Sequence, residues 1–276
     1  MPKMKKRNSV LLSTPYIIWM IVFTLIPLGV VGYYALTDPS TGAFTWGNLL
    51  NLQMYLPVLW QSILYSLVSA LICLLLGYPV AYYIAHTGAL AQKILYMLVM
   101  LPMCMSFLLR TLAWVGLLQD TGIINDLLEA VGIGRLQLIR TPGAVVLGMV
   151  YNYLPYMILP LYSTIVKIDK RLIEAAEDLG CNGVQVFTKV VFPLSMPGIL
   201  SGITMVFVPA VSTFYISQKL GGTDTVLIGD VIERQFKQGN NPTLGAALSL
   251  VLMILVFVCT GIMNRFGADE EGGVVV

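Results

Sequence analysis

The segment 167–193 carries the densest group of charged side chains in an otherwise apolar chain, with eight of its thirty Lys, Arg, Asp and Glu residues. Asp169 is placed to cap a helix running from Lys170 to Leu179. Gly180 stands where a helix ends in a left-handed residue. A second short helix is predicted from about Val184 to Phe192, stopping at Pro193. Two such helices form a compact surface suited to helix-in-groove binding of a soluble partner.

The first of these helices is predicted to be amphipathic. Its apolar residues fall at helical spacing on one face: Leu172, Ile173, Ala176 and Leu179. We expect that face to pack on the rest of the chain, while the charged residues face water. A plain connecting loop is the alternative. It explains the charge, but not the ordered glycine and proline stops.

The composition of the whole chain indicates what class of protein carries this segment. The chain has 276 residues, of which 57% are hydrophobic and 11% are charged. A soluble domain carries about 25% charged residues, so these charges are too few to cover a water-soluble surface. Disordered chains are polar and charged, which excludes disorder. A net charge of +2 argues against a nucleic-acid partner. The composition indicates an integral membrane protein.

Apolar runs of about 20 residues, the length that crosses a bilayer, predict an all-α polytopic protein with six transmembrane helices. Residues 38–58 are interpreted as a loop, because prolines, glycines and asparagines interrupt them. Arg110 interrupts the third span. The predicted spans are Tyr16–Leu36, Gln61–Ala85, Ile94–Leu118, Pro142–Val166, Gly198–Ser217 and Leu244–Met263.

The distribution of basic residues predicts the orientation. With a cytoplasmic N-terminus, ten of the sixteen Lys and Arg residues lie inside, while the acids divide evenly between the two sides. Both termini and the loop 167–197 are therefore expected in the cytoplasm. Residues 1–276 are interpreted as a single transmembrane domain that contains this loop.

The loop carries a recognisable motif. Glu174-Ala175-Ala176 is followed by three residues, Gly180, nine residues and then Val190-Val191-Phe192-Pro193. This pattern resembles the EAA motif of bacterial ABC-importer permeases, with Val190 in place of Ile and Phe192 in place of Leu. The resemblance implies the type I (MetI-like) permease fold. It also implies that Glu174, Ala175, Ala176, Gly180 and Pro193 couple the permease to an ATPase subunit.

A wider stretch, from Pro142 to Asp230, resembles the permeases of spermidine/putrescine importers. The likeness is carried by Leu159–Ser163, Phe192–Ile199, Leu220–Gly222 and Leu227–Ile232. It implies polyamine import across a bacterial inner membrane by alternating access. The implied partners are a second, related permease, a dimeric ABC ATPase that binds ATP and Mg²⁺, and a periplasmic or lipid-anchored substrate-binding protein. That protein would dock on residues 38–58, 119–141 and 218–242.

Polyamines are extended cations, so a pathway for them would use carboxylates and aromatic faces, each cation–π contact contributing about 0.5–2 kcal/mol. Solvated loop acids and interfacial aromatics are the alternative for each candidate. Arg110 and Lys219 would repel a polycation, so either both face away from the pathway or the substrate is a different solute. The pathway candidates are Trp46, Trp114, Tyr215, Asp120, Asp224 and Asp230.

The chain lacks the sequence signs of an enzyme. It has no G-x-x-x-x-G-K-[ST] loop, so ATP hydrolysis must come from a partner. It has one histidine, His86, and no C-x-x-C pair, so neither a catalytic nor a metal site is expected, and no cofactor in this chain. A permease for another small cationic or organic solute remains open. A stand-alone secondary transporter would need mid-membrane carboxylates, and the predicted spans contain none.

Overall fold

The computed structural model describes residues 15–37, 42–45, 47, 51–223, 225–237 and 241–271. They form helices and connecting turns, with one isolated antiparallel bridge between Thr37 and Phe44 in this part of the chain. The residues group into two compact units. The first draws on Met1–Leu56 and Val231–Ile254, and the second on Pro57–Asp230 and Leu255–Val276. The predicted single domain over residues 1–276 stays a prediction.

The prediction of an all-α polytopic membrane protein is confirmed. Five helices among the described residues are long and apolar enough to span a membrane. They are Pro15–Ala35, Leu52–His86, Phe107–Ala130, Pro142–Ile165 and Pro242–Met263. The pair Gly183–Leu194 and Met196–Val211, bent by 63°, supplies a sixth span if it is counted as one.

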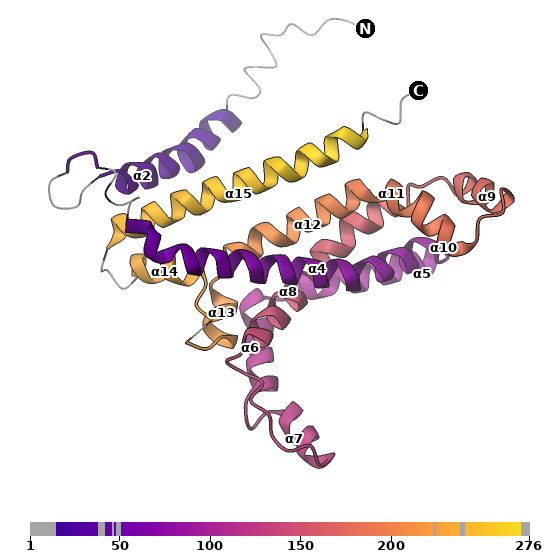
Figure 1. Cartoon of the computed structure of the whole chain (residues 1–276), viewed down its shortest axis with the longest axis horizontal. Helices are drawn as coiled ribbons and strands as arrows, with labels where there is room; N and C mark the ends of the chain where they lie inside the picture. The colour runs from indigo at the N-terminus through magenta and orange to yellow at the C-terminus, as the bar shows by residue number, and fades with distance from the viewer. Residues whose placement is uncertain are drawn as a thin grey trace, which may run out of the picture. The chain divides into compact units, whose positions relative to one another are not determined.

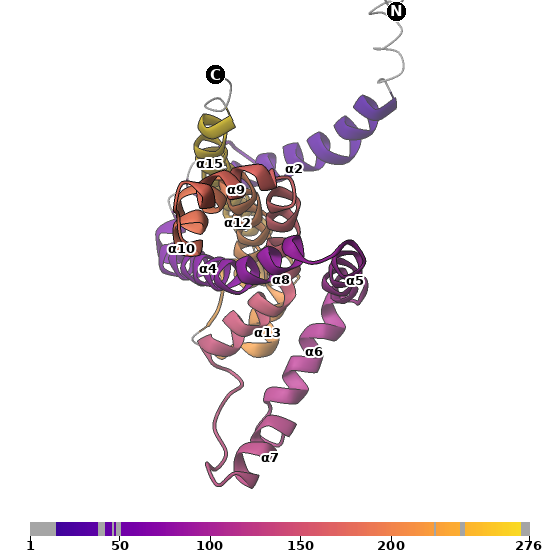
Figure 2. The same ribbon diagram turned by 90° about the vertical axis from the view of Figure 1, so that its right-hand side faces the viewer.

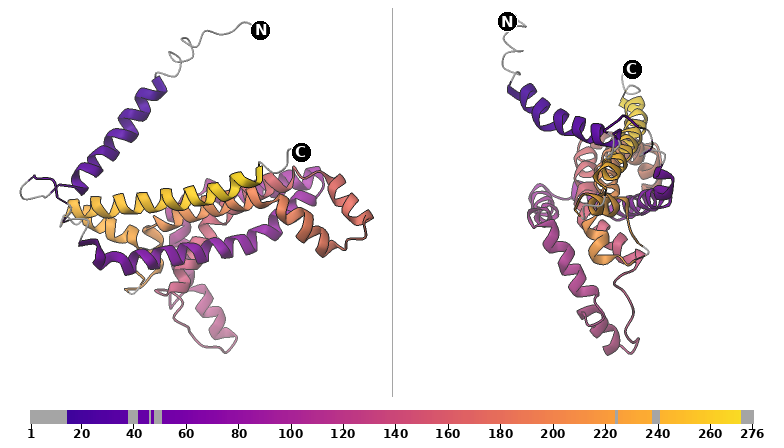
Figure 3. Two further views of the ribbon diagram at one scale, coloured as in Figure 1. Left: turned by 45° about the horizontal axis from the view of Figure 1, so that its top comes forward. Right: turned by 90° about the vertical axis from the view of Figure 1, so that its left-hand side faces the viewer.

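The first unit contains the start and part of the end of the chain. A π-helical turn, η1 (Ile21–Leu25), leads into α2 (Ile26–Ala35), and a 3-10 turn, η2 (Asn51–Tyr55), leads into the next long helix. Part of the predicted loop 38–58 is therefore helical. Near the C-terminus, α14 (Ile228–Lys237) is followed by α15 (Pro242–Glu271), one continuous helix in Figure 3.

Three helices form the core of the second unit: α4 (Leu56–His86), α8 (Pro142–Ile165) and α12 (Met196–Val211). Helices α8 and α12 pack along their lengths. Glycines allow the close approach, because a Cβ added to Gly198 or Gly202 would collide with α8. The buried centre includes Cys73, Met149, Met157, Leu161 and Val206.

The predicted third span is not one helix, so that prediction is wrong. The chain forms α5 (Ala89–Met100), a 3-10 turn η3 (Leu101–Cys104) and α6 (Phe107–Leu118). Met105 and Ser106 are outside the helical region of backbone torsions and separate the two helices. A further helix, α7 (Ile123–Ala130), lies within the region interpreted as an outer loop. Figure 2 shows α6 and α7 extending away from α5.

The predicted fifth span, Gly198–Ser217, is also shorter than expected. Helix α12 ends at Val211, and a separate helix, α13 (Tyr215–Leu220), follows. Pro209 lies two residues before that end and has no backbone N–H to continue the hydrogen-bond ladder. The span was predicted from the absence of charge across Ser212, Thr213 and Phe214, and an uncharged stretch does not report backbone geometry.

Candidate functional site

The segment 167–197, called the loop module below, begins with the helix α9 (Lys170–Asp178). The Asp169 carboxylate accepts a hydrogen bond from the Arg171 amide at 3.0 Å, as its predicted role as the N-cap requires. The helix ends at Gly180, whose φ is +84°. The Gly180 amide donates to the Glu177 carbonyl and the Cys181 amide to the Ala176 carbonyl, which together form a Schellman motif. Both predicted ends of this helix are confirmed.

The second half of the loop module starts with a complete capping box. The Asn182 side chain accepts from the Gln185 amide, and the Gln185 side chain accepts from the Asn182 amide, each at 2.9 Å. The chain then runs through α10 (Gly183–Val186), a π-helical turn η4 (Phe187–Val191) and α11 (Phe192–Leu194). In Figure 1 these elements gather with α9 at one end of α4 and α5.

The predicted stop at Pro193 is wrong. Pro193 lies in the first turn of α11, where its missing N–H costs little, and the helix continues to Leu194. The direction changes at Ser195, between α11 and α12, with the bend of 63°. Pro197 explains the position of the bend, because in a continuous helix its N–H would bond to the Pro193 carbonyl.

The loop module has a small core of its own, formed by Ala176, Val186 and Val191. Half of the predicted apolar face of α9 belongs to this core, since Ala176 is buried and Ile173 is half-buried. Leu172 and Leu179 are 49% and 85% exposed, so the prediction that all four apolar residues pack inward is wrong. The two leucines stay exposed because α10 and η4 pack only against the side of the nine-residue helix α9 that carries Ala176.

The residues of the EAA-like motif divide between core and surface. Ala176 is buried, while Glu174, Ala175, Gly180 and Pro193 are exposed. Together with the uncovered Leu172, Leu179 and Val184, they give the module a surface that mixes apolar and acidic side chains. Exposed large apolar residues beside a charged rim are typical of a protein interaction site.

Aromatic rings join the loop module to α4. The ring of Tyr78 lies 5.5 Å from Phe187 and 6.1 Å from Phe192, and the ring of Tyr82 lies 6.0 Å from Phe187. The Tyr78 hydroxyl lies 2.8 Å from Ser195 Oγ, at the bend. Sequence reasoning missed this junction. The available signals were the two prolines that flank Ser195 and the four-residue spacing of Tyr78, Tyr82 and His86.

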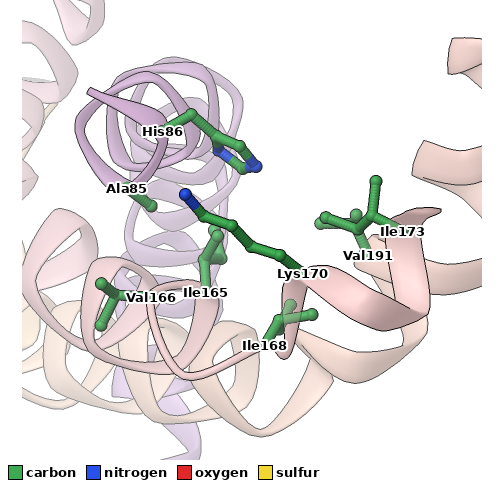
Figure 4. Close-up of a pocket in the computed structure, with 8 residues that line it drawn as sticks. All are labelled: Ala85, His86, Ile165, Val166, Ile168, Lys170, Ile173 and Val191. Carbon is green, nitrogen blue, oxygen red and sulfur yellow. The ribbon is translucent and has the colours of Figure 1, made fainter. Parts of the chain in front are cut away.

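A small pocket of about 30 Å³ opens where α4 and α8 meet the module (Figure 4). His86 and Lys170 point into it, and the other six lining residues are apolar: Ala85, Ile165, Val166, Ile168, Ile173 and Val191. His86 Nδ1 lies 2.8 Å from the Tyr82 carbonyl oxygen. A carbonyl oxygen only accepts hydrogen bonds, so Nδ1 is the ring nitrogen that carries the hydrogen. The pocket is large enough to hold a water molecule.

Polar contacts organise the segment 119–141. The buried Asn125 side chain donates to the carbonyls of Gln119 and Leu136 and accepts from the Leu136 amide. Arg135 pairs with Glu129 at 2.9 Å and Asp126 at 3.4 Å. The hydrogen bond to Glu129 raises the pKa of Arg135. The candidate Asp120 is exposed just after α6.

The remaining candidates for the substrate pathway come from different segments of the sequence, and their role in the pathway stays a prediction. Asp230 is buried, and its carboxylate accepts from the Leu227 amide at 2.9 Å, so it helps to start α14. Trp114 meets Tyr151 edge to face at 5.4 Å. Trp46 and Asp224 lie outside the described residues.

Lys219 and Arg110, the two basic residues that would repel a cationic substrate, lie in different surroundings. The Lys219 ammonium lies over the Tyr215 ring, 5.8 Å from its centroid, so part of that candidate aromatic surface faces a cation of the same helix. Arg110 is buried in the first turn of α6, and its Nε and Nη1 have no acceptor among the described residues. Its side chain is therefore largely withdrawn from solvent, and it forms no ion pair with an acid in that part of the chain.

The sequence was compared with known protein families and proteins. Residues 8–268 match the family model described as "Binding-protein-dependent transport system inner membrane component". The chain belongs to this family of inner-membrane transport components. The spermidine/putrescine transport system permease protein PotB of Haemophilus influenzae is 39% identical over 248 residues, which cover 86% of each chain. PotB of Escherichia coli is 36% identical over 247 residues, covering 86% of this chain and 90% of PotB.

Solved structures show the same fold. A bacterial ABC transporter that imports the acidic polysaccharide alginate contains a chain that matches with a TM-score of 0.80 at 18% identity, over 96% of both chains. A chain of the MetNI methionine ABC transporter matches with a TM-score of 0.59 at 18% identity, over 79% of this chain and 97% of that one. The predicted type I ABC-importer permease fold is thereby confirmed, and this family member is a membrane transport subunit.

Proposed function

We propose that this chain is the permease subunit of a binding-protein-dependent ABC importer for polyamines, and that the loop module couples it to a separate ATPase. The observation that carries the coupling role is the exposed position of the EAA-like motif on a module with its own caps and core. Glu174 and Ala175 face solvent, while Ala176 anchors the helix beneath them. Spermidine and putrescine are proposed as substrates because of the similarity to PotB.

The surface chemistry of the module suits a groove on a soluble protein. Leu172, Leu179 and Val184 offer exposed apolar area, and Glu174 adds an exposed carboxylate on the same module. A partner groove that is apolar at its centre and basic at its rim would be complementary. Glu174 is proposed to contact that rim, and Gly180 and Pro193 to set the shape of the module.

The proposed transport cycle is alternating access. ATP and Mg²⁺ bind to the ATPase dimer, which contains the phosphate-binding loop that this sequence lacks. A substrate-binding protein delivers the polyamine to the outer loops, and a second, related permease completes the pathway. The termini and the loop module are proposed to be cytoplasmic, in agreement with the distribution of Lys and Arg.

The coupling role is tested by replacing Glu174 with Gln in the full chain co-expressed with its ATPase subunit. We expect co-purification of the ATPase to fall several-fold, because an exposed charge at the proposed contact is lost. Glu177→Gln is the matched control, since Glu177 is an equally charged, exposed residue of α9 outside the motif. Equal co-purification of the two variants and the unchanged chain would contradict the proposed contact.

The substrate is tested separately by uptake of radiolabelled spermidine and putrescine into cells that lack other polyamine importers. Uptake that depends on this chain and on ATPase activity supports the proposal. If neither polyamine is taken up, but the complex assembles and its ATPase is stimulated by another solute, the polyamine assignment is wrong and the coupling role stands.

A further inference from the structure

A buried chain of hydrogen bonds crosses the bend between the loop module and α12. Ser195 is fully buried, and its hydroxyl donates to the Phe192 carbonyl at 2.8 Å. A serine hydroxyl has one proton, so the contact of 2.8 Å with Tyr78 must have the tyrosine as the donor. Tyr78 is 8% exposed. A side chain of α4 is thus bonded to the residue at which the module joins α12.

Without the bond to Tyr78, the bend at Ser195 would be the weakest point in the connection between the loop module and α12. The Ser195 amide donates to the carbonyls of both Val191 and Phe192, at 2.9 and 3.1 Å, so the helical ladder is already irregular there. Pro197 removes the next regular donor. Helix ends and kinks with missing ladder bonds bend more readily than continuous helices. Without another restraint, a displacement of the module would change the angle at Ser195 rather than move α12.

Other contacts that the described residues make across this junction are between aromatic rings. The rings of Tyr78, Tyr82, Phe187 and Phe192 pack at centroid distances between 5.5 and 6.2 Å, which are ring contacts and not hydrogen bonds. The Tyr78–Ser195 hydrogen bond is directional, and breaking it would leave the buried Tyr78 hydroxyl without its partner, while Ser195 would keep its bond to the Phe192 carbonyl. It is therefore a directional contact that ties α4 to the bend between the module and α12.

We propose that Tyr78 and Ser195 are positioning residues that make the loop module and α12 move together, so that the energy of ATP hydrolysis reaches the transport pathway. This inference rests on the proposed function. It assigns the transmission of movement to one hydrogen bond between a membrane helix and the bend, apart from the exposed motif that contacts the ATPase.

The test uses the complete importer in lipid vesicles and measures spermidine transported per ATP hydrolysed. Tyr78→Phe removes one oxygen and keeps every ring contact, and Ser195→Ala removes the other partner. Each variant is expected to retain the ATPase subunit and its ATP hydrolysis, while the transport ratio falls about fivefold or more, the factor that corresponds to a net hydrogen bond of about 1 kcal/mol. The double variant should be no worse than Ser195→Ala, because that change already removes the bond to Tyr78 together with the bond to the Phe192 carbonyl.

Tyr82→Phe is the matched control. Tyr82 lies one turn further along α4 and packs on the same Phe187, and its hydroxyl has no described hydrogen bond. Its transport ratio should stay unchanged. An unchanged ratio in Tyr78→Phe would overturn the inference. Loss of assembly in Tyr78→Phe but not in Tyr82→Phe would also overturn it, by showing a purely structural role. If the unchanged complex neither binds the ATPase nor moves spermidine, the proposed function itself fails.

Discussion

Gly198 of α12 lies so close to Thr164 of α8 that an added Cβ would be 2.7 Å from the threonine Oγ1. The same Cβ would be 3.1 Å from the Pro160 carbonyl oxygen. Thr164 cannot easily turn away, because its hydroxyl donates to that carbonyl at 3.0 Å. The contact between the two best-packed helices of the second unit therefore depends on the absence of a side chain at this position.

Replacing Gly198 with Ala is expected to destabilise the chain by about 1–3 kcal/mol, the usual cost of overpacking. The melting temperature of the purified protein in detergent measures the effect. Gly143→Ala is the control, since a Cβ there would meet only Thr141 Oγ1, at 3.8 Å. If both variants melt at the same temperature as the unchanged chain, α8 and α12 are less tightly packed than described.

The left-handed conformation of Gly180 leads to a second prediction. An alanine at φ +84° is strained by roughly 1–2 kcal/mol, so Gly180→Ala should loosen the end of α9. Hydrogen exchange of the Gly180 and Cys181 amides, which form the Schellman bonds, should become faster. Gly180→Asn should have a smaller effect, because asparagine tolerates this conformation better. Equal exchange in Ala and Asn variants would argue against strain as the cause.

The buried guanidinium of Arg110 supports a third prediction. A charge that is desolvated without an acceptor destabilises the folded state, so Arg110→Met, which keeps an unbranched side chain of similar length, should raise the melting temperature. Arg135→Met, at an exposed ion pair, should change it little. A lower melting temperature for Arg110→Met would mean that the guanidinium is satisfied in the folded protein. Reduced transport together with higher stability would identify Arg110 as a residue retained for function.

Asn125 provides a fourth prediction. Its amide bonds to Gln119 before α7 and to Leu136 after it, so Asn125→Ala should leave the Leu136 amide and carbonyl without these partners, while the Gln119 carbonyl keeps its bond from the Gly122 amide. Hydrogen exchange across residues 119–138 should accelerate several-fold. Gln137→Ala, an exposed change in the same loop, should leave the exchange unaltered. Similar exchange in both variants would show that other contacts hold the loop.

The features that were predicted correctly from sequence depend on neighbours along the chain. Asp169 caps a helix two residues away, and Gly180 ends it through bonds to Ala176 and Glu177. Such contacts depend on residue type and spacing, so a sequence reveals them. The span Pro142–Val166 was also predicted to within a residue of the observed Pro142–Ile165, and the Thr141 cap and Pro142 at its start are local signals of the same kind.

The features that were missed depend on residues far apart in the sequence or on backbone geometry. The break at Met105 and Ser106 interrupts a run of continuous hydropathy, so a window of apolar residues cannot detect it. The pairing of Tyr78 with Ser195 joins positions 117 residues apart. The burial of Arg110 depends on how α6 packs in three dimensions, which the charge and sequence position of the residue do not reveal.

The caps and the small core of the loop module use residues between Tyr82 and Val191. All of these residues are synthesised before Met196, where α12 begins. N-terminal parts of a growing chain fold first when their contacts are complete. The surface that we assign to the ATPase can therefore form while the last two membrane spans are still being translated. The ATPase subunit could bind this surface before synthesis of the permease is complete.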